Sequence, residues 1–120
     1  MKTLEFSPIN SIVFVSDNLH TRPPVHQDSG LIHFNNESVS VGCYPEVSGS
    51  TIFTLGPARE VAPDFELAFD GMIETPSKKL IITTVLDEIL LEADVTDLTT
   101  RVRVWLNHPK WPDKVVVGWG

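Results

Sequence analysis

Residues 65–117 read FELAFDGMIETPSKKLIITTVLDEILLEADVTDLTTRVRVWLNHPKWPDKVVV, and this stretch decides the fold. Apolar and polar residues alternate along it with a period close to two, at which successive side chains leave opposite faces of a β-strand. Within residues 65–70, the pattern predicts that Phe65, Leu67 and Phe69 face the core. The stretch therefore predicts short strands joined by turns.

The rest of the chain divides in the same way. The expected strands are residues 11–16, 31–34, 37–43, 51–55, 65–70, 80–86, 89–95, 100–106 and 114–119. Asn35-Asn36, Asp70-Gly71 and Asp87-Glu88 supply turn residues, and residues 17–30, 56–63 and 107–112 are expected as loops. We predict an all-β fold, an antiparallel β-sandwich of about 8–9 short strands, with residues 1–120 forming a single domain.

Residues 84–93 admit two interpretations. Five apolar residues between Val85 and Ala93 also fit the stripe of an amphipathic helix. Strands are favoured because residues 80–85 are dominated by β-branched side chains, which are stiff in helices and fit a pleated sheet. Asp87-Glu88 then becomes the turn between two strands.

Charge is the second signal in the sequence. Sixteen acids against nine bases give a formal net charge of −7, and residues 60–97 hold ten of the acids and only two bases, Lys78 and Lys79. Direct nucleic-acid binding is disfavoured, because phosphate contacts need positive charge. Such a surface would attract a basic protein partner, although acidity can also serve solubility alone.

The sequence predicts a cytoplasmic protein with no membrane segment. No stretch approaches the roughly 20 apolar residues that a membrane span needs, and the N-terminal residues show no export signal. A single cysteine, Cys43, excludes an internal disulfide and fits a reducing compartment.

We predict no catalytic residue, no metal site and no cofactor. Cys43 and His33 could form a thiol–imidazole pair, but no third orienting residue is evident, and a strand cysteine is ordinarily a small buried hydrophobe. His20 and His26 share a loop with Asp17 and Asp28, but closed metal sites have tighter ligand spacing. The chain is therefore not expected to be an enzyme.

The order of segments resembles that of the ComJ-type nuclease inhibitors, small acidic β-sandwich proteins associated with bacterial competence and toxin-immunity systems. The resemblance rests on the apolar strand at 12–15, Pro23-Pro24, the Gly-x-Ile-x-Phe pattern at Gly30, Ile32 and Phe34, the strand at 65–69, and the run 80–85, 89–93 and 101–105. It implies a protein that inhibits a nuclease by presenting carboxylates where the nuclease binds phosphates. The carboxylates expected to reach solvent by strand alternation are Glu66, Asp70, Glu74, Glu88, Glu92 and Asp94.

Three further residues are candidate partner contacts. Trp105 is expected to face outward with Arg101 and Arg103, on which it could stack, or to anchor a partner. If the strand at 89–95 pairs with that at 100–106, the arginines would lie beside Asp94 and Glu92.

Other roles remain open. Trp105 and Trp111 could form a carbohydrate- or small-ligand-binding platform, and a structural protein is a third alternative. The strand at 114–119 carries little charge, so it would favour a homodimer if it lay at a sheet edge.

Overall fold

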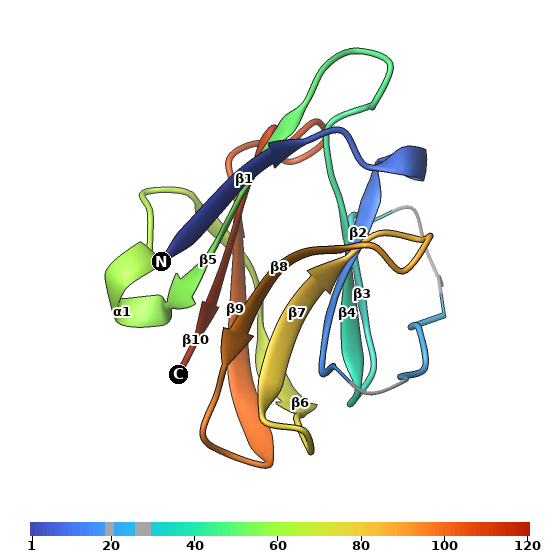
Figure 1. The fold of residues 1–120 in the computed structure, drawn as a ribbon. Helices are drawn as coiled ribbons and strands as arrows, with labels where there is room; N and C mark the ends of the chain where they lie inside the picture. The colour runs from blue at the N-terminus through green and yellow to red at the C-terminus, as the bar shows by residue number, and fades with distance from the viewer. Residues whose placement is uncertain (19–20, 26–29) are drawn as a thin grey trace.

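Two five-stranded sheets pack face to face in the computed structural model, which describes residues 1–18, 21–25 and 30–120 (Figure 1). The prediction of an all-β sandwich is confirmed, with ten strands in the described residues rather than eight or nine. Neighbouring strands are antiparallel throughout, except for one parallel pair, β5 and β10.

The first sheet contains the first and the last strand of the described chain. Its order is β1 (Lys2–Phe6), β5 (Thr51–Pro57), β10 (Lys114–Trp119), β9 (Thr99–Leu106) and β6 (Glu66–Glu74). A single helical turn, α1 (Ala58–Val61), covers part of its outer face, on the left of Figure 1.

The second sheet contains the remaining five strands. Its order is β3 (Ile32–Phe34), β4 (Ser38–Gly42), β2 (Ile12–Ser16), β7 (Lys79–Thr83) and β8 (Ile89–Asp94). A short 3₁₀ helix, Ile9–Ser11, leads into β2.

The core lies between the inner faces of the two sheets. Every central strand contributes a pair of alternating apolar side chains, and these are fully buried: Val13, Val15, Val39, Val41, Leu80, Ile82, Phe53, Leu55, Val102, Val104, Val115 and Val117. Complete burial of one such side chain stabilises the fold by about 1.5–3 kcal/mol. The alternation in the sequence therefore has its physical origin in this layer.

Two predicted hairpins are confirmed. In the turn between β3 and β4, the Asn35 side-chain oxygen accepts the backbone N–H groups of Glu37 and Ser38 at 2.8 and 2.9 Å. Between β7 and β8, residues 84–88 form a turn in which Asp87 has φ +62°. Residues 84–93 thus form a turn and a strand, and the helical alternative is wrong.

Two elements were not predicted. No strand was predicted at β1, although it pairs with β5 and its Phe6 packs against the core. The region 56–63, expected as a loop, contains α1, whose Ala58 and Val61 are buried against Trp105.

The expected turn at Asp70-Gly71 is wrong, because β6 runs straight through it. β6 instead contains a bulge, in which Leu67 pairs with Trp105 and Phe69 with Val104, leaving Ala68 as the extra residue. One extra residue reverses the side-chain alternation. Leu67 therefore lies on the exposed outer face rather than in the core, while Phe69 is buried as expected.

Two expected pairings are also corrected. β8 and β9 belong to different sheets, so Arg101 and Arg103 do not pair with Asp94 and Glu92. β10 lies between β5 and β9 and is hydrogen-bonded on both sides, so the condition under which this strand would favour a homodimer, a place at a sheet edge, is not met. Within the described residues, the helices are far too short to cross a lipid bilayer.

Candidate functional site

The six predicted carboxylates fall into two groups at different edges of the sandwich. Glu66, Asp70 and Glu74 lie on β6. This strand neighbours β3 of the other sheet, where the ring centre of Phe34 lies 5.1 Å from that of Phe69 in β6. The other three, Glu88, Glu92 and Asp94, belong to the β7–β8 hairpin, which approaches β1 where Lys2 Nζ donates to the Glu92 carbonyl. The six do not form one surface.

The β6 group is interleaved with arginines. Arg101 donates to both oxygens of Asp70 at 2.9 and 2.7 Å, and this hydrogen bonding lowers the pKa of the Asp70 carboxyl. Arg103 lies beside it, donating to the Gly120 carbonyl at 2.7 Å, with its guanidinium 5.8 Å from the Trp105 ring centre. Negative charge on this face is therefore partly neutralised.

Trp105 is not an exposed contact. It points away from the core, as predicted, but α1 covers it and leaves only 7% of it accessible. It packs with Ala58, Val61 and Val116. The predicted platform of Trp105 and Trp111 therefore does not form, because only Trp111 is exposed.

The β7–β8 hairpin combines acids with exposed apolar side chains. Leu86 and Ile89 are 64% and 50% exposed, beside Asp87, Glu88 and Glu92. Asp94 accepts a hydrogen bond from Lys79 Nζ at 3.0 Å, which raises the pKa of Lys79. We call the residues 84–94 the acidic hairpin.

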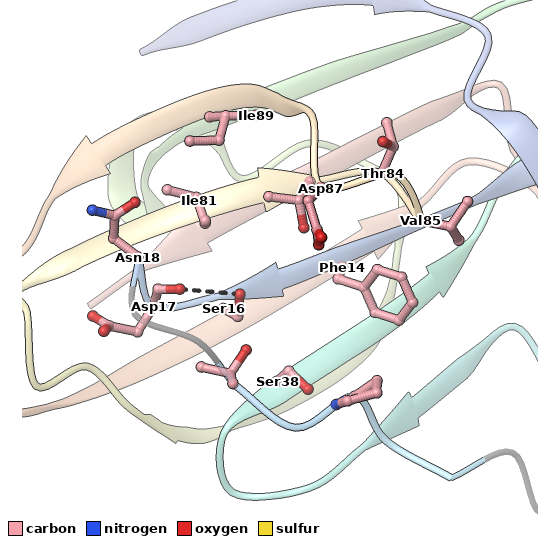
Figure 2. A pocket seen from close by; sticks show the side chains of 13 residues that line it. Phe14, Ser16, Asp17, Asn18, Ser38, Ile81, Thr84, Val85, Asp87 and Ile89 are labelled. Atoms are coloured by element: carbon pink, nitrogen blue, oxygen red, sulfur yellow. Dashed lines mark hydrogen bonds between the residues drawn. The ribbon is translucent and has the colours of Figure 1, made fainter.

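A hollow of about 550 Å³ lies beside the acidic hairpin, on the outer face of the second sheet (Figure 2). Strand register explains how it forms. One row across the sheet runs Ser38, Ser16, Ile81 and Glu92, and the next runs Ser40, Phe14, Thr83 and Ile89. Small residues in both rows leave space above the strands.

A second bulge turns Ile89 toward this hollow. Ile82 pairs with Leu91 and Thr83 with Ile89, so Leu90 is the extra residue of β8. Ile89 thereby joins Phe14 and Ile81 on the outer face, instead of sharing the inner face with Leu91 as the alternation predicted.

Asp17 lies at one end of the hollow, with its carboxylate turned away from the other lining side chains (Figure 2). Asp17 is 1% exposed and accepts hydrogen bonds from the hydroxyl and the backbone N–H of Ser77, at 2.7 and 3.2 Å. Asp87 stands on the rim next to Thr84 (Figure 2). None of the described residues that line the hollow is basic.

Sequence reasoning missed this hollow. Ser38 and Ser40, at alternate positions of one predicted strand, were a usable signal of an outer face with little bulk. Nothing in the sequence indicated that Asp87 would stand at its rim, because the register of the hairpin decides this.

The alternatives involving cysteine and histidine gain no geometric support. Burial raises the pKa of the Cys43 thiol to about 11, so it carries no thiolate at neutral pH. His20, His26 and Asp28 lie outside the described residues. Elsewhere, in residues 1–18, 21–25 and 30–120, no three His, Cys, Asp or Glu side chains gather as a metal site requires.

Comparison with known proteins gives one informative result. No family model matches the chain, and no curated protein matches its sequence. Among solved structures, the fold is similar to that of a nuclease inhibitor. This similar structure is the crystal structure of ComJ from Bacillus subtilis, an inhibitor of the DNA-degrading activity of NucA.

The likeness extends over nearly the whole chain. It covers 99% of this chain and 94% of ComJ, with a TM-score of 0.72 and 11% sequence identity. The resemblance expected from segment order is therefore confirmed as a shared fold.

Proposed function

We propose that this chain is an immunity-type inhibitor that binds a nuclease, or another protein with a basic cleft, and blocks it. The observation that carries the proposal is the whole-length similarity of fold to an inhibitor of a DNA-degrading activity. The net charge of −7 supports the same direction, since a nuclease cleft that binds phosphates attracts an acidic protein.

The acidic hairpin is the proposed contact surface. Asp87, Glu88 and Glu92 would occupy positions that the partner otherwise gives to phosphates. Leu86 and Ile89 supply apolar area, which charged residues alone lack and which interfaces need at their centre.

The β6 group lies outside the proposed contact surface. Asp70 is already bound by Arg101 on both oxygens, so it offers a partner less unsatisfied charge than Glu92 does. Arg101 and Arg103 would repel a basic cleft. Trp105 supports the sheet beneath α1 rather than touching a partner.

The test measures DNA degradation by two purified nucleases, NucA of Bacillus subtilis and the nuclease encoded nearest to the gene for this chain. We expect the wild-type chain to suppress at least the second. The double variant Glu88→Lys/Glu92→Lys should require a concentration about a hundred-fold higher, because interface charge pairs contribute roughly 1.5 kcal/mol or more each.

Glu66→Lys/Glu74→Lys is the matched control, since it makes the same change of net charge at two exposed positions of β6, on the other edge. It should inhibit like the wild type. The proposal fails if a large excess of the chain leaves DNA degradation by both nucleases unchanged. Equal losses in the double variant and the control would remove the acidic hairpin as the contact surface.

A further inference from the structure

We propose that the hollow beside the acidic hairpin receives a lysine or arginine side chain of the partner protein. This inference deepens the proposed function and rests on it for the nature of the partner. It concerns a site with its own shape, hydrogen-bonding pattern and charge, each of which points to a long cationic side chain.

The floor of the hollow suits an aliphatic stem. Phe14, Ile81 and Ile89 come from three neighbouring strands and form its apolar surface (Figure 2). Lysine and arginine bury their methylene groups along such surfaces while the charged end reaches polar groups. The volume of about 550 Å³ also leaves room for the backbone that carries the side chain.

Two hydroxyl groups in the hollow, those of Ser16 and Ser38, can serve a ligand as acceptors. Ser16 Oγ donates its proton to the Asp17 carbonyl at 3.2 Å, and Ser38 Oγ donates to the Arg22 carbonyl at 2.7 Å. A hydroxyl has one proton to give but two lone pairs. With their protons engaged, both oxygens favour a ligand that only donates hydrogen bonds, as guanidinium and ammonium groups do.

The charge of the hollow is negative. Asp87 stands on the rim, and Glu92 lies beside Ile81 in the same row. These carboxylates would repel a phosphate or carboxylate ligand and attract a cation.

The probe for this site is n-butylguanidinium, which reproduces an arginine side chain, and its neutral isostere n-butylurea is the matched control. Both are titrated into the ¹⁵N-labelled full chain while backbone amide shifts are recorded. We expect butylguanidinium to shift the amides of Ser16, Thr83 and Asp87 in a saturable way, and butylurea to shift them much less.

Two substitutions separate rim charge from overall charge. Asp87→Asn keeps the backbone at φ +62°, a conformation that asparagine adopts readily, and should weaken butylguanidinium binding about five-fold. Asp64→Asn removes an equally exposed charge near the opposite sheet and should leave binding unchanged. Equal shifts from the two probes, or shifts confined to other strands, would overturn the inference.

The outcome is independent of nuclease inhibition. If butylguanidinium binds the hollow but the chain inhibits no nuclease, the proposed function fails while the cation site stands. If the chain inhibits and Asp87→Asn inhibits equally well, the cation site is not used and this inference fails.

Discussion

At the scale of single residues, environment rather than identity sets the chemistry. Cys43 and Asp17 are both nearly inaccessible, yet one is an inert thiol and the other a carboxylate held by Ser77. Asp87 and Asp70 are both exposed, but Arg101 already binds Asp70 on two oxygens. An exposed carboxylate can therefore already be paired within the chain, which its residue type does not reveal.

Burial of Cys43 predicts a pH dependence of stability. The thiol keeps its proton up to about pH 11 in the folded chain but loses it near the ordinary pKa of 9.0 once unfolded. Because the unfolded state then binds fewer protons, the free energy of unfolding should fall as pH rises from 9 toward 11, by about 3 kcal/mol at most.

Cys43→Ala is the comparison that isolates this effect from the titration of lysines and Tyr44. Urea unfolding at pH 8, 9 and 11 should show a smaller decline for the variant than for the wild type. Parallel declines in the two proteins would mean that Cys43 ionises equally easily in the folded and unfolded states.

At the scale of elements, close packing of α1 on the first sheet depends on Gly118. A Cβ at this position would lie 2.8 Å from the Ala58 Cα and 3.0 Å from Trp105, and a backbone atom cannot move aside without shifting the helix. Gly118→Ala should therefore destabilise the fold by about 1–3 kcal/mol.

Gly42→Ala provides the contrast for this prediction. Its added Cβ would meet the Cδ2 end of the Leu31 side chain at 2.7 Å, and a flexible side chain can turn away. Thermal unfolding should show a clearly larger loss for Gly118→Ala. Equal losses would mean that α1 moves away from the sheet at little cost.

The elements also show which parts of the fold the sequence could predict. Apolar and β-branched runs located β7, β8, β9 and β10, because each strand packs apolar side chains against the core. The bulges at Ala68 and Leu90 could not be predicted from the alternation of residues. Each bulge adds one unpaired residue to its strand, which places Leu67 and Ile89 on the opposite face from the one that the alternation indicates.

The candidate site was predictable only in part for the same reason. Glu88, Glu92 and Asp94 were identified as outward carboxylates, and the structure places them on one hairpin. The hollow depends on residues of β2, β4, β7 and β8 that are distant in sequence. Their juxtaposition is set by the order of strands in the sheet, which local patterns do not encode.

At the scale of the whole molecule, a net charge of −7 predicts electrostatically steered association with a basic partner. The association rate constant with the inhibited nuclease should fall by about ten-fold as salt rises from about 0.02 to about 0.5 M, while dissociation changes less. Stopped-flow mixing at several salt concentrations measures this. A salt-independent rate would indicate that apolar contacts alone guide the encounter.

The central proposal is that carboxylates of the acidic hairpin take the place of DNA phosphates in a nuclease cleft. Steady-state DNA degradation at a series of DNA concentrations, with and without the chain, tests it most directly. The wild-type chain should raise KM for DNA and leave kcat unchanged. The double variant Glu88→Lys/Glu92→Lys should not raise KM. A fall in kcat at unchanged KM, undiminished in the double variant, would contradict it.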